Sequence, residues 1–338
     1  MSGAGKPLAL SLGDPAGIGP ELICEVWAQR GSLGLPPFAV FGGASVLAAA
    51  ARSRGLDIAP IGIDTIGAVD AALFDSGIPV VGPLDGGWTP GAPDAAGAQL
   101  ALGSLTAACA SVRDGDAGAL VTLPVGKAQL ATVGFGFPGQ TEFLAAECGL
   151  PARDAVMMLA GPSLRAVPLT VHCALAEVPR LLSFDLIQHK ARIVDAALRR
   201  DFGIARPRIA LAGLNPHAGE EGRMGSEEQQ VIAPAIAALR ADGIDASGPH
   251  PADALFTHRA RETYDVALAM YHDQALIPLK ALDFDEGVNV TLGLPIVRTS
   301  PDHGTAFGIA GEGIADPGAT IAALKMASEM AARRASHG

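Results

Sequence analysis

The sequence has no long apolar run, no basic run and no paired cysteine motif. Its 338 residues contain no apolar stretch of about 18, the length that a membrane span needs. The N-terminal stretch MSGAGKPLALSLGD holds too few apolar residues for a secretory signal. We therefore expect a cytoplasmic protein with no membrane partner. No two cysteines form a C-x-x-C pair, which favours reduced thiols; they are Cys24, Cys109, Cys148 and Cys173.

Charge and composition exclude further classes. The formal net charge is −11 at pH 7, from 24 Lys and Arg against 35 Asp and Glu, and no basic patch is interleaved with aromatic residues. This argues against nucleic acid and anionic membranes as main partners. With 49% hydrophobic residues, 42 Gly and 25 Pro, the chain suits a globular α/β protein with many tight loops. Its length predicts two domains.

Apolar runs of strand length alternate with segments of helical period along most of the chain. A helix is expected over Phe184–Phe202, where apolar positions follow 3–4 spacing. The last helix has Asp316 as its N-cap and Pro317 at its first position. Such alternation implies βαβ units and a mostly parallel sheet. The expected strands are Leu8–Leu12, Phe38–Phe41, Ala119–Leu123, Ala155–Leu159, Arg165–Val171, Ile209–Leu214, Val266–Met270 and Val288–Leu292.

We expect two interleaved α/β/α domains with mostly parallel sheets. The first comprises residues 1–128 and 296–338, and the second comprises residues 129–295. No internal repeat or low-complexity linker separates them, which favours interleaving over a tandem arrangement. The segment Ile61–Gly97 is rich in Gly and Pro and is expected to be an irregular surface excursion.

The stretch SLGDPAGIGPELI follows the first expected strand, where a nucleotide-binding turn would stand. The dinucleotide fingerprint needs G-x-G-x-x-G after that strand. Gly17 and Gly19 supply two glycines, but Leu22 occupies the third position. Pro20 also has no N–H to donate to a phosphate. The stretch therefore fails the fingerprint.

Three of the eight histidines share one setting. His172, His217 and His272 each follow an expected strand. Ligands of open α/β sheets bind at the carboxyl ends of strands, and three imidazoles there would form an open site for a divalent transition metal. A single histidine after a strand is usually an ordinary hydrogen-bonded residue near a surface loop, but three histidines in the same topological position favour a metal site. His189, His250, His258 and His337 lack that setting.

Two carboxylates accompany these histidines. Asp273 directly follows His272, and Asp253 lies in GPHPADALF. A carboxylate beside a metal can orient a ligand histidine, coordinate the ion or accept a proton. A turn or a helix cap explains Asp253 equally well.

A polar set follows within twenty residues. Lys280, Asn289 and Arg298 together suit a phosphate or a carboxylate, since charge-assisted hydrogen bonds are the strong ones. Ordinary surface ion pairing with Asp283, Asp285 or Glu286 explains Lys280 well and Asn289 poorly.

These motifs carry a family resemblance over nearly the whole chain. SLGDPAGIGPE, FPGQTEFLA, GLNPHAGEEGRMGSEE, PADALF, MYHDQALIPLK and GVNVTLGLPIVRTSPDHGTA occur in one order. The chain thereby resembles the 4-hydroxythreonine-4-phosphate dehydrogenase family of pyridoxal phosphate biosynthesis. That family is part of the isocitrate and isopropylmalate dehydrogenase superfamily, which implies an isocitrate/isopropylmalate dehydrogenase-like fold. The first loop of this superfamily resembles GDPAGIGPE, and its members bind NAD or NADP without the usual Rossmann loop.

The resemblance implies roles for single residues. His172, His217 and His272 match the metal ligands, and the metal is left open among zinc, cobalt, nickel, manganese and magnesium. The substrate positions are Gln140, Thr141, Lys280, Asn289 and Arg298. The stretch from His303, with Gly304 and Gly308, resembles the adenosine-binding loop, which puts the cofactor loop in the first domain. Catalytic roles for Asp273 and Asp253 stay open.

The implied reaction is oxidation of a secondary alcohol by NAD(P)⁺, followed by loss of CO₂ from the β-keto acid. The substrate is 4-phosphohydroxy-L-threonine and the product 3-amino-2-oxopropyl phosphate. The metal polarises the alcohol oxygen and stabilises the enolate left by decarboxylation. Family members are homodimers whose active sites take residues from both subunits.

Two departures leave alternatives open. Gln140 stands where the family commonly has histidine, so it cannot carry charge toward a phosphate. Relatives oxidise other phosphorylated hydroxy acids or aromatic cis-dihydrodiols, and a dihydrodiol carboxylate is the alternative substrate. Gly308 stands where NAD-specific members have aspartate and NADP-specific members have lysine, which predicts weak cofactor selectivity. A non-catalytic binding protein is the rival from another class, but the three histidines and the HGTA loop are all present.

Overall fold

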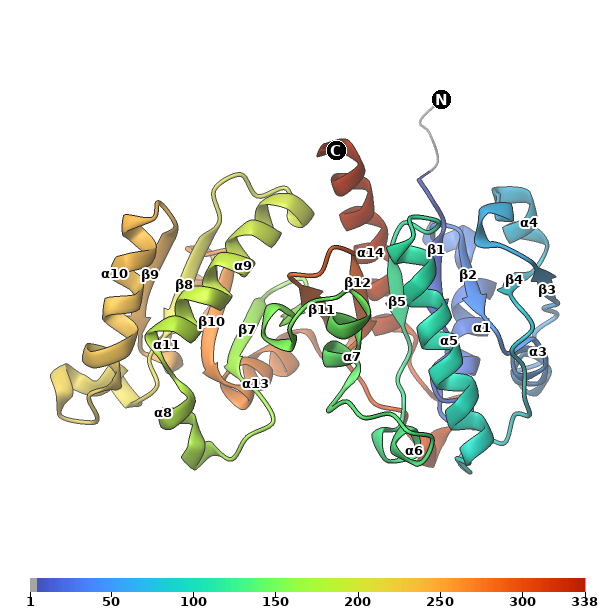
Figure 1. Ribbon diagram of the computed structural model, residues 1–338, viewed down its shortest axis with the longest axis horizontal. Coiled ribbons are helices and arrows are strands. Elements are labelled where there is room, and N and C mark those ends of the chain that lie inside the picture. Colours follow the sequence, from blue (N-terminus) through green and yellow to red (C-terminus); the bar gives the residue numbers. More distant parts are fainter. Residues whose placement is uncertain (1–4, 338) are drawn as a thin grey trace. The chain divides into compact units, whose positions relative to one another are not determined.

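The computed structural model describes residues 5–337, which form two compact units (Figure 1). Among these residues, unit 1 comprises 5–152 and Leu294–Ser336, and unit 2 comprises Arg153–Gly293. The two units interleave along the chain, because unit 1 takes its last segment from beyond unit 2. The predicted domain boundaries at 128/129 and 295/296 stay a prediction; in the structure, residues 129–152 make their contacts within unit 1.

Unit 1 contains six parallel strands in the order β3-β4-β2-β1-β5-β12. The inner strands are apolar runs such as LALS and FAVF, which are buried on both faces as parallel strands usually are. The bounds are β1 Leu8–Ser11, β2 Phe38–Phe41, β3 Pro60–Ile63, β4 Ile78–Val81, β5 Leu120–Thr122 and β12 Arg298–Pro301.

The helices of unit 1 flank these strands. Among them, α5 is long and apolar enough to cross a membrane by length and composition, which the sequence analysis did not anticipate. Helix α5 packs on β1, β2 and β5, so burial in the core of unit 1 also explains its composition. The bounds are α1 Gly19–Ala28, α2 Arg30–Leu33, α3 Ala44–Ser53, α4 Ala71–Ser76, α5 Ala95–Arg113, α6 Lys127–Thr132, α7 Gln140–Glu147 and α14 Gly318–His337, with short 3₁₀ helices η1 Ile66–Ala68, η2 Ala152–Asp154 and η7 Phe307–Ile309.

Unit 2 contains six strands in the order β11-β6-β7-β10-β8-β9. Strand β6 is antiparallel to both neighbours, and the pairs β7–β10, β10–β8 and β8–β9 are parallel. The mixed α/β fold with mostly parallel strands is therefore confirmed. The bounds are β6 Val156–Ala160, β7 Arg165–Thr170, β8 Arg208–Ala212, β9 Asp245–His250, β10 Val266–Tyr271 and β11 Val288–Leu292.

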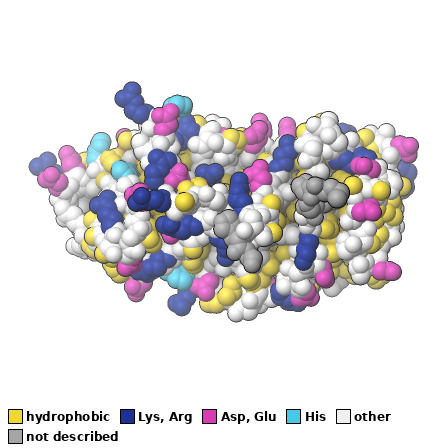
Figure 2. All heavy atoms as spheres, turned by 90° about the horizontal axis from the view of Figure 1, so that it is seen from above, with side chains coloured by type: hydrophobic (Ala, Val, Ile, Leu, Met, Phe, Trp, Pro, Cys, Tyr) yellow, Lys and Arg dark blue, Asp and Glu magenta, His cyan; other side chains and the backbone are white. Residues whose placement is uncertain are grey.

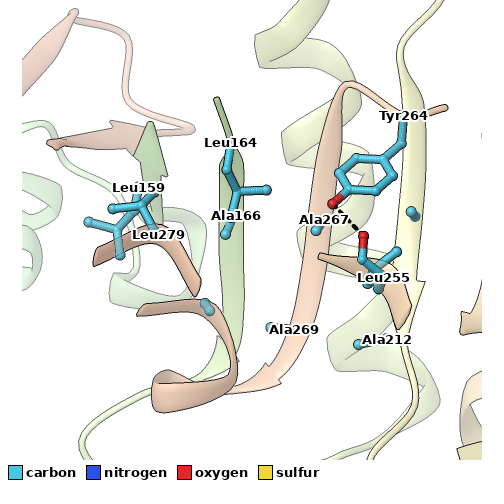
Figure 3. Close-up of a cluster of buried hydrophobic side chains, with 11 residues drawn as sticks. Leu159, Leu164, Ala166, Ala212, Leu255, Tyr264, Ala267, Ala269 and Leu279 are labelled. Carbon is cyan, nitrogen blue, oxygen red and sulfur yellow. Dashed lines mark hydrogen bonds between the residues drawn. The ribbon is translucent and has the colours of Figure 1, made fainter. Parts of the chain in front are cut away.

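The helices of unit 2 cover a core built on β6, β7, β8 and β10. Helix α9 begins at Phe184 and ends at Phe202, as predicted, and its Ser183 cap accepts the N–H of Leu186. Figure 3 shows part of the core, where the Tyr264 hydroxyl donates to the Leu255 carbonyl at 3.0 Å. The bounds are α8 Val178–Leu181, α9 Phe184–Phe202, α10 Ala233–Ala241, α11 Ala252–Leu255, α12 His258–Arg261 and α13 His272–Asp283, with 3₁₀ segments η3 Leu175–Glu177, η4 Pro216–Gly222 and η6 Phe284–Glu286 and the π-helical segment η5 Glu228–Ile232.

The expectation of an irregular excursion over Ile61–Gly97 is wrong in part. The segment holds the end of β3, helix α4 and strand β4 before α5 begins. Strands PIGI and IPVV are only four residues long and carry Pro at or near their start, so their pattern resembles a loop. Residues 82–94 match the expectation, because they form no helix or strand.

The visible surface carries both signs of charge. On the face drawn in Figure 2, Lys and Arg side chains lie among Asp and Glu side chains and apolar atoms. This mixture agrees with the interspersed charges of the sequence.

Candidate functional site

Three neighbouring strands of unit 2 each precede one of the predicted metal-binding histidines. His172 follows β7, His217 follows β8 and His272 follows β10. Strand β10 lies between β7 and β8 and is parallel to both. The three carboxyl ends therefore share one edge of the sheet, as the sequence predicted.

His172 and His272 lie close together. Their ring centroids are 6.0 Å apart, and the ring planes are tilted by 40°. Both side chains line one cavity of about 250 Å³, together with Thr170, Tyr271 and Asp273. Two imidazoles that bind one metal at about 2.1 Å place their ring centroids roughly 5 Å apart, so these two rings would approach by about 1 Å to share a divalent ion.

Asp273 orients one of these rings. Its Oδ1 is 2.7 Å from Nδ1 of His272. An ionised carboxylate only accepts hydrogen bonds, so the contact assigns the proton to Nδ1 and leaves the Nε2 lone pair available. Of the roles considered for Asp273, this geometry favours orienting a ligand histidine. Asp253 is exposed in the first turn of α11.

His217 stands in a left-handed turn of the chain. Residues 217–221 all have φ between 41° and 78°, a conformation that costs roughly 1–2 kcal/mol for each residue with a side chain. The buried Glu228 carboxylate supports the turn through Asn215: Oε1 accepts the backbone N–H at 2.7 Å and Oε2 accepts Nδ2 at 3.0 Å. Gly219 leaves room for this carboxylate, because a Cβ there would lie 2.6 Å from Oε2.

The structure does not bring His217 into one group with the other two histidines. Within residues 5–337, no group of three or more His, Cys, Asp or Glu side chains is placed to hold a metal ion. The three-histidine metal centre therefore stays a prediction, supported by the His172–His272 pair alone.

Gln274 joins two of the strand ends, which the sequence analysis missed. Its Oε1 accepts the N–H of Met270, at the end of β10, at 2.6 Å. Its Nε2 donates to the carbonyl of Gly213, just after β8, at 2.8 Å. Gln274 is buried, so these bonds are shielded from water and fix the distance between the segments that carry His217 and His272.

Lys280 and Asn289 lie away from the histidine edge within unit 2. Lys280 is exposed on α13, eight residues after His272, which is roughly 12 Å along a helix. Through the β11–β6–β7 register, Asn289 is level with Ala166, near the opposite end of β7 from His172. The buried Oδ1 of Asn289 has no hydrogen-bond partner among the described residues.

The other histidines have local partners or fall outside the described side chains. The side chain of His337 is not described. The remaining contacts are His189 Nε2 with Asp154 at 2.9 Å, His250 Nε2 with Ser247 at 3.0 Å and His258 Nδ1 with Glu262 at 3.7 Å.

In unit 1, a buried cation lies against Thr122, the last residue of β5. This cation is Arg298, the first residue of β12, which is only 3% exposed. Its guanidinium donates to Thr122 Oγ1 at 2.7 and 3.2 Å and to Gln140 Oε1 at 3.1 Å. Burial lowers the pKa of Arg298 to about 10, so the group is still a cation at neutral pH.

Gln140 and Thr141 begin helix α7 beside this guanidinium. Gln140 presents its oxygen to Arg298, while its Nε2 donates to the Leu123 carbonyl at 3.4 Å. Both residues are half-buried in the first turn of α7, where backbone N–H groups favour anions. The structure therefore places Gln140 against Arg298, and Thr141 follows Gln140 in the same helical turn. Thr122, the other acceptor, was not a predicted site residue.

The glycine-rich first loop packs against the predicted adenosine-binding loop, both in unit 1. The N–H of Ile18 donates to the Thr305 carbonyl at 3.0 Å. A Cβ on Gly17 would lie 2.8 Å from that same carbonyl oxygen, so only glycine allows the approach. His303 Nδ1 lies 3.1 Å from the carbonyl of Gly304, and Gly308 is exposed with open space where a side chain would stand.

Comparisons with known proteins agree over the whole chain. A family model described as pyridoxal phosphate biosynthetic protein PdxA matches residues 35–327. The chain is 64% identical to the 4-hydroxythreonine-4-phosphate dehydrogenase of Erythrobacter litoralis over 330 residues, 98% of each protein. It is 54% identical to that of Methylorubrum populi, covering 100% of this chain and 98% of the relative.

Solved structures extend the likeness to three dimensions. A 4-hydroxythreonine-4-phosphate dehydrogenase from Klebsiella pneumoniae matches with a TM-score of 0.87 and 38% identity, covering 98% of this chain and 99% of that one. A terephthalate 1,2-cis-dihydrodiol dehydrogenase from Burkholderia xenovorans matches with a TM-score of 0.64 and 32% identity, covering 96% and 98%.

The α/β fold of the two units and the likeness to full-length dehydrogenases show that the chain is an α/β oxidoreductase. The dehydrogenase names of its relatives imply a nicotinamide cofactor. The chain belongs to the family of pyridoxal phosphate biosynthetic protein PdxA.

Proposed function

We propose that the chain oxidises the secondary alcohol of 4-phosphohydroxy-L-threonine with NAD⁺ or NADP⁺. The alcohol loses a hydride to the cofactor and a proton, and the β-keto acid loses CO₂ to give 3-amino-2-oxopropyl phosphate. The names of full-length relatives support this reaction. The structural observation that carries it is the buried Arg298 guanidinium, which contacts Thr122 at the carboxyl end of β5, and carboxyl ends of strands are where α/β enzymes bind ligands.

The substrate phosphate is bound by charge and by fixed donors. Arg298 supplies the charge, Thr122 and Gln140 hold its guanidinium in place, and Thr141 adds a hydroxyl in the first turn of α7. Holding the donor rigid before binding reduces the entropy lost when the substrate binds. Lys280 and Asn289 are the other two residues of the proposed substrate set.

A divalent metal is proposed to be held by His172, His217 and His272. When bound, such an ion supplies Lewis acidity toward substrate oxygens. Asp273 keeps the Nε2 lone pair of His272 available through its bond to Nδ1. The left-handed turn fixes the backbone position of His217, and the Glu228 carboxylate supports this turn through its hydrogen bond with Asn215.

The proton acceptor is proposed among Asp273 and Asp253. Asp273 is engaged by His272, with its side chain 68% exposed, and Asp253 is exposed at the start of α11. Asp253 stands free of the histidine pair and is therefore the carboxylate available to accept a proton. Asp273 instead orients the His272 ring and acts through that histidine.

The nicotinamide cofactor is proposed to bind at the loop from His303 to Gly308. This loop is held against the first glycine-rich loop by the Ile18–Thr305 hydrogen bond. The space at Gly308 accommodates either ribose 2′-substituent, since no side chain is there to accept from a hydroxyl or to repel a phosphate. Both NAD⁺ and NADP⁺ are therefore substrates.

The protein is proposed to be a cytoplasmic homodimer with shared active sites. Unit 2 leaves large apolar side chains exposed, with Leu175, Ile277 and Phe284 at 65%, 66% and 70% exposure. A second subunit would cover such residues. Shared sites would let a partner subunit complete the metal site, since the described residues of one chain bring no third ligand to the His172–His272 pair.

A cis-dihydrodiol carboxylate is the second candidate substrate, favoured by the likeness to the terephthalate dihydrodiol dehydrogenase. The carboxylate would then take the place of the phosphate at Arg298. The test is NAD(P)⁺ reduction by 4-phosphohydroxy-L-threonine, by 4-hydroxy-L-threonine and by terephthalate cis-dihydrodiol. We expect turnover of the phosphorylated compound alone. Faster turnover of the dihydrodiol would overturn the proposed substrate.

A further inference from the structure

Two cysteines of unit 1 meet at the ends of two helices and have no part in the proposed reaction. Cys109 lies on α5 and is fully buried. Cys148 caps the C-terminal end of α7 and is half-buried. Neither belongs to a disulfide in the structure.

The chain holds these helix ends together through Arg113. Cys109 and Arg113 are one turn apart on α5, and therefore share a face of that helix. Arg113 Nη1 donates to the carbonyl of Glu147 at 3.2 Å and lies 3.6 Å from its Oε2. Because Cys148 directly follows Glu147, the same clamp brings its thiol to Cys109, and the two thiols are hydrogen-bonded to each other.

This contact shifts the pKa values of the two thiols in opposite directions. The hydrogen bond from Cys109, helped by the Arg113 charge, lowers the pKa of Cys148. The same bond and burial raise the pKa of Cys109. The thiolate is the reactive form of cysteine, so the half-buried Cys148 is also the more reactive of the two thiols. This is the arrangement of a reactive cysteine beside a resolving cysteine.

The other two cysteines lack this combination. Cys24 is buried and its pKa is raised to about 12 by burial, so it stays an inert thiol. Cys173 is exposed beside His172, in a separate unit from the Cys109–Cys148 pair.

We propose that Cys148 and Cys109 form a peroxide-oxidised dithiol, in which Cys148 reacts first and Cys109 resolves it into a disulfide between α7 and α5. The Cys148 thiolate attacks one peroxide oxygen, the O–O bond breaks, and the other oxygen leaves as hydroxide and becomes water. The Cys109 sulfur then attacks the sulfur of the Cys148 sulfenic acid, whose hydroxide leaves with the Cys109 proton as a second water. Two thiols are oxidised and one peroxide is reduced.

The test uses the full-length reduced protein and hydrogen peroxide. After oxidation, free thiols are alkylated and the peptides are mapped by mass spectrometry without reduction. We expect the Cys109 and Cys148 peptides to be joined, and dithiothreitol to separate them. Free Cys109 and Cys148 in a sample whose Cys173 is already oxidised would overturn the proposal.

Three variants separate the roles of the sulfurs. Cys148→Ser loses the disulfide and leaves Cys109 a free thiol. Cys109→Ala leaves Cys148 as a sulfenic acid that dimedone labels, and labelling confined to Cys173 would contradict the order of reaction. Cys173→Ser is the matched control, in which the disulfide forms as in the wild type. Because these readouts are chemical, they do not depend on the proposed dehydrogenase activity.

Discussion

Replacing Arg298 by alanine removes a buried cation from the proposed phosphate site. The guanidinium makes two hydrogen bonds to Thr122 and one to Gln140, and its pKa of about 10 keeps it charged through neutral pH. A hydrogen bond to a charged group contributes about 1.5–3 kcal/mol. At about 1.4 kcal/mol for each factor of ten, KM for 4-phosphohydroxy-L-threonine should rise roughly 10- to 150-fold.

The assay is steady-state NAD(P)H formation with the substrate and the cofactor varied in turn. The cofactor KM should stay within about twofold of wild type, because the substitution lies at the substrate residues. Arg180→Ala is a matched control, since Arg180 is exposed and pairs with Glu177 at 2.9 Å on the surface. Circular dichroism establishes that both variants are folded. An unchanged substrate KM in folded Arg298→Ala would refute the anchoring role and favour the dihydrodiol substrate.

Three further predictions concern the metal, the cofactor and a buried carboxylate. His217→Ala and His272→Ala should each lose most bound metal by elemental analysis and nearly all activity while staying folded; full metal content with normal turnover would refute the ligand assignment. The wild-type kcat/KM values for NAD⁺ and NADP⁺ should differ by less than about 100-fold, or roughly 2.7 kcal/mol, and Gly308→Asp should shift preference toward NAD⁺. A preference above a thousandfold for either cofactor would show that another residue selects between NAD⁺ and NADP⁺. Burial raises the pKa of Glu21, so the stability this group contributes is lost as pH rises through the raised value. Glu21→Gln should therefore gain stability over wild type as pH rises from about 4.5, and a pH-independent difference in denaturant unfolding would contradict this.

The sequence predicts those strands whose residues are apolar. β2 and β11 have the predicted bounds, and the other predicted strands agree within two residues at each end. Strand β12 was not predicted because it reads RTSP and begins with a buried Arg, and β9 reads DASGPH at the end of its sheet. Polar strands of this kind are stabilised by packing against neighbouring strands, and the pattern of apolar residues in the sequence does not indicate such packing.

The candidate site likewise has features that the sequence predicts and features that only the folded structure reveals. The type and topological position of His172, His217 and His272 follow from a histidine after each apolar run. The left-handed turn at His217 could not be predicted, because its support comes from Glu228 and from the room that Gly219 leaves. Contacts such as Thr122 with Arg298 join residues 176 positions apart, and only the folded sheet brings them together.

The most direct test of the proposed reaction is NAD(P)H formation from 4-phosphohydroxy-L-threonine by the purified protein, before and after chelation. We expect turnover in the untreated protein, its loss on chelation and its return when a divalent metal is added back. No NAD(P)H from the phosphorylated substrate, with both cofactors and with zinc, cobalt, manganese or magnesium supplied, would contradict the proposed function. Turnover that survives complete removal of metal would contradict the role of the three histidines.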